Sequence, residues 1–166
     1  SSVAKSYIAG LLRHAPEFCA IIAQWVNSYK RLVPGYEAPC YICWGRKNRS
    51  AMVRVPMYKP GQEKATRAEL RSPDPAANPY LAFAVMLAAG LRGVEENYQL
   101  VAPVEIDVYE LSEKRRAELG IESLPRDLGH AIDLCEQSDV VREALGDHIF
   151  EKFIENKKIE WDNYRT

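Results

Sequence analysis

The chain has 166 residues, of which 47% are hydrophobic and 27% charged, a composition that favours a folded globular domain and excludes general disorder. Its 22 basic residues are balanced by 23 acidic ones, and this formal net charge of -1 predicts neither a nucleic-acid partner nor a membrane partner. The longest nearly apolar run, residues 80–91, is too short to span a bilayer and no basic-then-apolar leader opens the chain, so we expect a cytoplasmic protein.

The first predicted elements are two short helices within residues 3–25. Apolar residues recur there at helical spacing, but Pro16 has no amide hydrogen to donate and is expected to interrupt the helix. Residues 27–39 follow, with the sequence NSYKRLVPGYEAP. Two prolines and a glycine predict an irregular loop there, and a long loop in a compact domain is commonly functional.

Two strands are predicted next, over residues 40–44 and 51–56. The first contains the pair Cys40 and Cys43, whose C-x-x-C spacing would suggest zinc or redox chemistry. Residues three apart in a strand point to opposite faces, however, and a zinc ribbon needs a second pair of ligands. We therefore expect structural cysteines. Four cysteines in this length of chain fit a reducing compartment better than a disulfide framework.

A third predicted strand carries Arg67, Glu69 and Arg71 at alternate positions. Side chains alternate between the two faces of a strand, so these three charges should share one face. A hairpin with the second strand would place Arg54 beside them. Charged residues on one face of a strand most often form the solvated side of a sheet. A purely structural role for these three residues is therefore the alternative to a functional one.

The local excess of positive charge favours a binding site for a polyanion. The basic side chains are Arg46, Lys47, Arg49, Arg54, Arg67 and Arg71. Their mutual repulsion is relieved by an anion, and the planar fork of arginine donors matches phosphate and carboxylate oxygens. Glu69 could ligate Mg²⁺, which prefers one or two carboxylates plus phosphate oxygens. Arginines beside a metal-binding carboxylate indicate phosphoryl transfer but identify neither the nucleotide nor the acceptor.

The rest of the chain is predicted to be helical. Asn78 is a good N-cap and Pro79 a good first residue for a long helix, which is apolar on nearly all sides and should be buried. Later helices are expected in residues 123–137 and 140–145 and in a final segment whose apolar stripe is Phe150, Phe153, Ile154 and Trp161. The histidines His14, His130 and His148 are expected to be structural or exposed. The predicted fold class is α+β, with antiparallel strands bearing the charges, packed on helices, and a helical C-terminal part.

Four segments together resemble the catalytic region of the glutamine synthetase family: NSYKRLVPGYEAP, NRSAMVRVP, RAELRSPDPAANPYLAF and AAGLRG. The resemblance extends over residues 1–166 and is to the type I enzymes of bacteria and archaea. It implies that these residues are the C-terminal portion of a catalytic domain, without its first part and without the preceding β-grasp domain. The implied reaction is ATP-dependent ligation of ammonia to L-glutamate through γ-glutamyl phosphate. Mg²⁺ or Mn²⁺ is the implied cofactor, ATP, L-glutamate and ammonium are the substrates, and the whole enzyme is a homo-oligomer, a dodecamer in this family.

The resemblance also implies roles for individual residues. Arg31 matches the arginine that grips the glutamate carboxylate, and Glu37 matches the loop glutamate that closes the site and helps deprotonate ammonium. Arg49 and Arg54 match arginines that contact the phosphates, and Arg49 also serves glutamate and catalysis.

Three further positions match residues around the nucleotide and the transferred phosphoryl group. Glu69 corresponds to a metal ligand, and Arg71 corresponds to a catalytic arginine near the phosphoryl group and glutamate. Lys64 and Arg67 correspond to residues beside ATP. In some bacterial relatives a loop tyrosine is adenylylated, and Tyr109 occupies a comparable place. Its surroundings match that loop poorly, so an ordinary exposed tyrosine is expected.

Two other functions compete with glutamine synthesis. A γ-glutamyl-amine ligase of the same superfamily would share these motifs and use an organic amine in place of ammonia. A non-catalytic relative or fragment would only fold and associate. The presence of Glu37, Glu69 and the arginines favours catalysis in the parent protein. Residues 1–166 alone are expected to be inactive.

Overall fold

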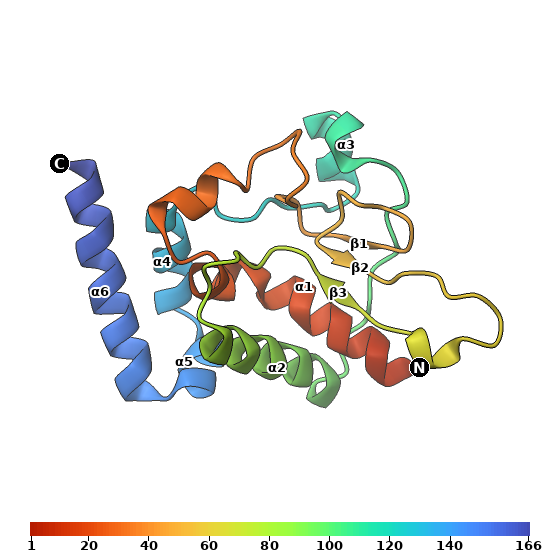
Figure 1. Ribbon diagram of the computed structural model, residues 1–166, viewed down its shortest axis with the longest axis horizontal. Helices are drawn as coiled ribbons and strands as arrows, with labels where there is room; N and C mark the ends of the chain where they lie inside the picture. Colours follow the sequence, from red (N-terminus) through yellow and green to blue (C-terminus); the bar gives the residue numbers. More distant parts are fainter.

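The computed structural model describes residues 1–166 and combines helices with a small sheet, which confirms the predicted α+β class. The elements are α1 (Ser2–Ile22), η1 (Val26–Lys30), β1 (Trp44–Gly45), β2 (Val53–Arg54), η2 (Glu63–Ala65), β3 (Glu69–Leu70), α2 (Pro79–Glu95), η3 (Val108–Glu110), α3 (Glu113–Glu118), α4 (Leu128–Glu136), α5 (Asp139–Leu145) and α6 (Asp147–Arg165). Figure 1 shows α1 and α2 side by side at the centre. The sheet lies toward the N-terminus, and α4, α5 and α6 lie toward the C-terminus.

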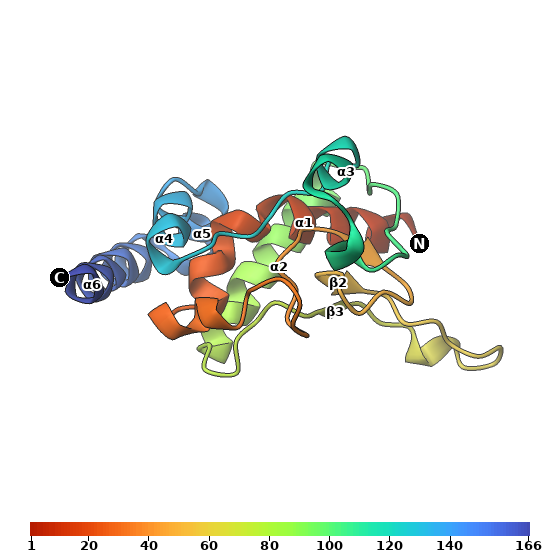
Figure 2. The same cartoon turned by 90° about the horizontal axis from the view of Figure 1, so that it is seen from above.

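Helix α1 is one bent helix, so the predicted pair of short helices is wrong. Pro16 lies inside it, and Figure 2 shows the helix changing direction along its course. A proline inside a helix costs about 3 kcal/mol because it removes a hydrogen bond and clashes with the preceding turn. Here buried side chains on both sides of the proline, including Leu12 and Phe18, offset that cost. The proline bends α1 without ending it.

Glycines bring the backbones of α1 and α2 into direct contact. A Cβ atom placed on Gly93 would lie 2.2 Å from the carbonyl oxygen of Ser6, and one on Gly10 would lie 2.2 Å from that of Ala89. Both distances are far shorter than a real contact. The two helices can therefore approach this closely only because these positions have no side chain.

A partly buried chain of polar side chains links α1 to the segment after α2 and to the start of α5. His14 Nδ1 lies 2.5 Å from a carboxylate oxygen of Glu17, and its Nε2 lies 3.2 Å from the hydroxyl of Tyr98. Ser138, the N-cap of α5, donates its hydroxyl hydrogen to Glu17 at 2.7 Å. His14 is therefore a structural histidine, as predicted.

Helix α2 begins as predicted but is not buried on all sides. The Asn78 side chain accepts hydrogen bonds from two amides of the first turn, and Pro79 is the first helical residue. Its outer face, however, exposes four large apolar side chains: Tyr80 (85%), Phe83 (67%), Leu87 (54%) and Leu91 (43%). Because α1 and α5 pack against the other side of α2, the expectation of burial on nearly all sides is wrong.

The sheet has the order β1-β2-β3, and its strands are only two residues long, shorter than the sequence predicts. Strands β2 and β3 are antiparallel with Arg54 opposite Glu69, which confirms the predicted hairpin. Strands β1 and β2 are parallel, an arrangement that the sequence did not indicate. Parallel strands usually need a long crossover. Here Asn48 fixes the short return loop by donating from Nδ2 to the carbonyl oxygens of Val104 and Ile106.

The C-terminal part is helical, as predicted. Phe150 and Ile154 of α6 are buried, while Phe153 and Trp161 are partly buried against the core. The four cysteines are free and buried, at positions 19, 40, 43 and 135. Burial raises the pKa of the Cys43 thiol to about 11, which keeps it protonated at neutral pH. None of the helices has the length and apolar character needed to cross a membrane.

We predict that Gly93→Ala lowers the free energy of unfolding by about 1–3 kcal/mol. Replacing a glycine inside a helix by alanine ordinarily stabilises it by roughly 0.5–1 kcal/mol. The 2.2 Å approach to the Ser6 carbonyl oxygen outweighs that gain, because backbone atoms must move. Urea unfolding followed by circular dichroism measures the change. Leu87→Ala, on the exposed face of the same helix, is the control; equal stability of the Gly93→Ala chain would contradict the prediction.

Candidate active site

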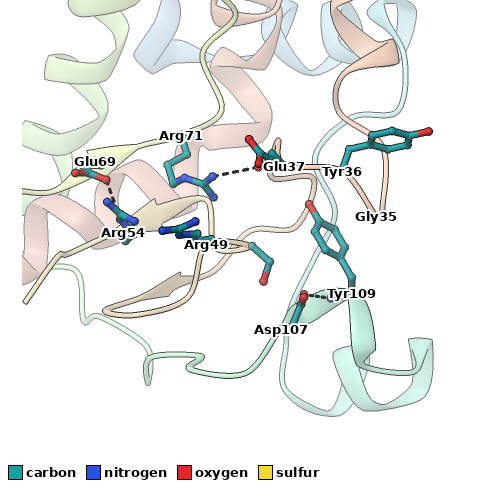
Figure 3. Close-up of a pocket in the computed structure, with 10 residues that line it drawn as sticks. Gly35, Tyr36, Glu37, Arg49, Arg54, Glu69, Arg71, Asp107 and Tyr109 are labelled. Carbon is teal, nitrogen blue, oxygen red and sulfur yellow. Dashed lines mark hydrogen bonds and ion pairs between the residues drawn. The ribbon is translucent and has the colours of Figure 1, made fainter.

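Five of the predicted site residues come together in one open cleft of about 650 Å³. The residues that line it are Gly35, Tyr36, Glu37, Arg49, Ser50, Arg54, Glu69, Arg71, Asp107 and Tyr109. Figure 3 shows that they come from three segments: the irregular loop after η1, the sheet with its connecting loop, and η3. Three guanidinium groups therefore share the cleft wall with three carboxylates and two tyrosines.

Glu69 is the centre of an ion-pair network on the β2–β3 hairpin. Arg54 Nε donates to one carboxylate oxygen of Glu69 at 2.8 Å, and Arg67 Nε donates to the other at 2.8 Å. These arginines, Arg54 foremost, hold the pKa of the Glu69 carboxyl below its ordinary value. Glu69 is therefore ionised at neutral pH. The ion pair between Arg67 and Glu69 agrees with the predicted placement of these two charges on one face. The Arg67 side chain is 57% exposed and is not part of the cleft lining.

Arg71 contributes a charge that has no acidic partner. Its guanidinium donates to the carbonyl oxygens of Glu37 at 3.1 Å and Ala51 at 3.4 Å, and it makes no ion pair. Burial and the neighbouring charge of Arg54 lower its pKa from the ordinary value, although arginine stays protonated at neutral pH. The Arg71 charge is therefore free to meet an anion in the cleft.

Arg49 is held by its two neighbours in the sequence. Asn48 is fixed to the 104–106 segment, as described above, and the Ser50 hydroxyl donates to Asn48 Oδ1 at 2.5 Å. The Ser50 oxygen in turn accepts the amide hydrogen of Val108 at 3.0 Å. The Arg49 side chain has no hydrogen bond or ion pair of its own within the protein. Its backbone is fixed while its guanidinium is available to a ligand.

Glu37 lies on the irregular loop predicted from the sequence. Its carbonyl oxygen is held by Arg71, whereas its carboxylate has no partner within the protein. The side chain is exposed and lies beside the cleft (Figure 3). A carboxylate in this position is able to accept a proton from a molecule bound in the cleft.

Arg31, Lys64 and Arg67 are not part of the cleft lining. Arg31 donates to the carbonyl oxygens of Ser72 at 3.1 Å and Arg71 at 3.2 Å, so in this structure it braces the chain that follows β3. Lys64 is exposed in η2, on a loop that reaches away from the body of the molecule in both Figures 1 and 2. The roles that the resemblance implies for these three residues stay predictions.

Tyr109 and Asp107 are among the lining residues that the sequence did not assign to the site. Tyr109 was expected to be an ordinary exposed tyrosine, but it is partly buried in the cleft and donates its hydroxyl hydrogen to the carbonyl oxygen of Ala38 at 2.7 Å. Asp107 accepts the amide hydrogen of Tyr109 at 2.9 Å. The only signal for Tyr109 was its place in the family motif, and no sequence pattern marked Asp107. Hydrogen bonds from Asn48 and to Ser50 hold residues 104–108 against the loop before β2, and this places both side chains at the cleft.

The residues present supply part of a metal site. No group of three or more His, Cys, Asp or Glu side chains is placed to hold a metal ion. Glu69 has carboxylate oxygens at the cleft wall, and Mg²⁺ prefers one or two carboxylates together with phosphate oxygens. Glu69 therefore fits as one ligand of such an ion, and these residues do not hold a complete ligand set.

Comparisons with known proteins give matches over the whole chain. The family model described as glutamine synthetase, catalytic domain, matches residues 1–166. The chain is 55% identical over 166 residues to a glutamine synthetase of Mycolicibacterium smegmatis and 52% identical to one of Methanocaldococcus jannaschii. It covers all of its own length but only 37% and 36% of theirs. A solved structure titled as a GmaS/ADP complex superimposes with a TM-score of 0.85 at 37% identity, over 99% of this chain and 37% of that one.

We predict that the stability contributed by Glu69 depends on pH with a defined sign. Its pKa in the folded chain is below the ordinary value of 4.5, so the unfolded chain binds more protons between the two values. The contribution is complete above about pH 4.5 and is lost as pH falls through the folded pKa. Urea unfolding of the original chain and of Glu69→Gln should differ at pH 7 and converge under acid conditions.

The control for this measurement is Glu122→Gln, because the Glu122 carboxylate has no side-chain partner. High salt should also shrink the Glu69 effect, since both members of the Arg54 pair are about a quarter exposed, at 26% and 27%. A difference that grows as the pH falls would contradict the assigned sign.

Proposed function

The chain belongs to the glutamine synthetase catalytic-domain family, and from that premise we propose that its protein joins ammonia to L-glutamate at the expense of ATP, giving L-glutamine. The supporting observation is the convergence of Glu37, Arg49, Arg54, Glu69 and Arg71 on one cleft. These residues come from separate segments, and each matches a family position with a role in this reaction. A structural role alone would not require three guanidinium groups to face open space.

The first step is phosphoryl transfer. A γ-carboxylate oxygen of glutamate attacks the γ-phosphorus of ATP, the bond to the bridging oxygen breaks, and ADP leaves with its electron pair. Negative charge spreads over the oxygens of the transferred group, and preorganised positive charge is the main source of catalysis for such a reaction. Arg49, Arg54 and Arg71 supply that charge. Arg49 and Arg71 have no acidic partner in the protein, so substrate anions provide the counter-charge.

A divalent ion belongs to the same step. When bound, the Mg²⁺ or Mn²⁺ that the family uses would neutralise phosphate charge, and Glu69 is the residue of this chain that would hold it. Glu69 also orients Arg54 within the cleft through their 2.8 Å ion pair. Its carboxylate thus serves the phosphate site through both the ion and the arginine.

The second step is capture of the γ-glutamyl phosphate by ammonia. The ammonia nitrogen attacks the carbonyl carbon, phosphate leaves, and one proton must be removed from the attacking nitrogen. Glu37 is suited to take that proton, since its carboxylate is unpaired and lies beside the cleft. The side chains for the two steps therefore come from different parts of the structure.

The chain spans about 37% of the length of the curated relatives it matches, so the active protein is proposed to be larger than these residues. By the family resemblance, residues 1–166 form the C-terminal portion of a catalytic domain within a cytoplasmic homo-oligomer. The remaining metal ligands would then come from other parts of that protein. This fits the incomplete ligand set around Glu69.

An organic amine in place of ammonia is the alternative for the same cleft. The 55% identity to a glutamine synthetase over the whole chain favours ammonia. Comparing ammonium with primary alkylamines as substrates of the full-length protein decides between the two. A higher kcat/KM for an alkylamine would replace the proposed reaction with that of a γ-glutamyl-amine ligase.

We predict that Glu69→Ala in the full-length protein slows γ-glutamyl phosphate formation by at least about a hundredfold, because the phosphates lose a metal-binding carboxylate and Arg54 loses its partner. Single-turnover ADP formation measures the effect, and Mg²⁺-dependent ADP binding provides a readout independent of turnover. Glu63→Ala, in η2 outside the cleft, is the matched control. Near-normal turnover at saturating Mg²⁺ would overturn the role given to Glu69.

We predict that Glu37→Ala affects the two half-reactions unequally. ADP formation in the absence of ammonium should change little, whereas glutamine formation should fall by roughly a hundredfold or more, the usual scale of a general-base contribution. Rapid-quench measurement of both products in the full-length protein tests this split. Equal loss in the two half-reactions would show that Glu37 serves binding or folding and not proton transfer.

A further inference from the structure

Two consecutive carbonyl groups of the Glu37 loop are held by side chains of the cleft. Arg71, which follows β3, donates to the carbonyl oxygen of Glu37 at 3.1 Å, and Tyr109, from η3, donates to that of Ala38 at 2.7 Å. Figure 3 shows the two side chains reaching the loop from different sides of the cleft. The loop has no regular secondary structure at these positions. Its course is therefore fixed at Glu37 and Ala38 largely by these two hydrogen bonds.

Tyr109 is well anchored for this purpose. Its neighbour Val108 is fully buried and donates its amide hydrogen to the Ser50 hydroxyl, and the Tyr109 ring packs 5.9 Å from that of Tyr41. Asp107 caps the start of η3 by accepting from the Tyr109 amide. Burial raises the pKa of the Tyr109 hydroxyl well above its ordinary value, so the group stays protonated and remains a donor.

We propose that Tyr109 is a positioning residue that holds the Glu37 carboxylate in place for the nitrogen-transfer step. This inference rests on the proposed function, because it gives Tyr109 its importance through Glu37. The hydroxyl donates to a backbone carbonyl and has no hydrogen bond to the Glu37 carboxylate, so it sets the course of the loop without removing the charge of Glu37. Arg71 alone would leave one of the two carbonyl groups free.

The size of the effect follows from the loss of one hydrogen bond. A hydrogen bond within a protein contributes about 0.5–1.5 kcal/mol net. That corresponds to roughly a two- to tenfold change in the population of the correctly placed loop. The step served by Glu37 should slow by this factor, while the arginines that serve phosphoryl transfer stay in place.

The test is Tyr109→Phe in the full-length protein, which removes the hydroxyl and keeps the ring. We expect kcat/KM for ammonium to fall about two- to tenfold, while single-turnover ADP formation without ammonium stays unchanged within error. Tyr41→Phe is the matched control, since it removes a hydroxyl from the same aromatic pair without touching the loop carbonyls. Equal loss in both half-reactions, or no loss in either, overturns the proposal.

Coupling to Glu37 separates positioning from general weakening of the protein. In a Glu37→Gln background, Tyr109→Phe should cause almost no further loss, because the group it positions is already inactive. A full multiplicative loss in the double variant overturns the inference. If Tyr109→Phe does not fold, Ala38→Gly loosens the same backbone and should produce the same selective loss.

These outcomes also distinguish this inference from the function on which it rests. If Glu37→Gln itself leaves nitrogen transfer unchanged, the proposed role of Glu37 fails, whatever Tyr109 does. If Glu37→Gln slows nitrogen transfer and Tyr109→Phe does not, only the positioning role of Tyr109 fails.

Discussion

One carboxylate among several guanidinium groups is the constraint around which the cleft is arranged. Two like charges about 4 Å apart repel by about 4 kcal/mol at the effective dielectric constant near a protein surface. Glu69 relieves this for Arg54 and Arg67, and leaves Arg49 and Arg71 without acidic partners. The cleft wall therefore carries more positive than negative charge at Arg49 and Arg71. An anion with several oxygens, such as a nucleotide phosphate, is the natural complement.

Holding such charges together requires a rigid support, and the chain supplies it through long-range contacts. The strands are only two residues long and could not keep their places alone. Asn48 and Ser50 tie the Arg49 loop to residues 104–108. Trp44, Met52 and Val53 of the sheet region are buried in the same hydrophobic core as residues of α1 and α2. Side-chain hydrogen bonds between residues 56 to 58 positions apart therefore hold these short strands in place. In larger sheets, longer strands provide that support through their own backbone hydrogen bonds.

The sequence could predict features that depend on local spacing. The alternating row at Arg67, Glu69 and Arg71, its hairpin with Arg54, and the Asn78 cap all follow from periods of two residues or from one helical turn. The bent α1 and the parallel β1–β2 pair could not be predicted, because tertiary burial outweighs Pro16 and remote hydrogen bonds fix the return loop. Tyr109 could not be placed for the same reason, since its partner Ala38 lies 71 positions away.

The cleft combines a rigid part with a part that is held more weakly. The arginines of the cleft lie on or beside the hairpin and on a loop fixed by buried side chains, whereas the Glu37 backbone is held by hydrogen bonds from Arg71 and Tyr109. Two such bonds together contribute about 1–3 kcal/mol. In the proposed reaction, phosphoryl transfer needs charge that is already in place, while the nitrogen nucleophile must still enter afterwards. An exposed carboxylate whose backbone is held by two hydrogen bonds suits that second step, because its position is set while the nucleophile can still reach it.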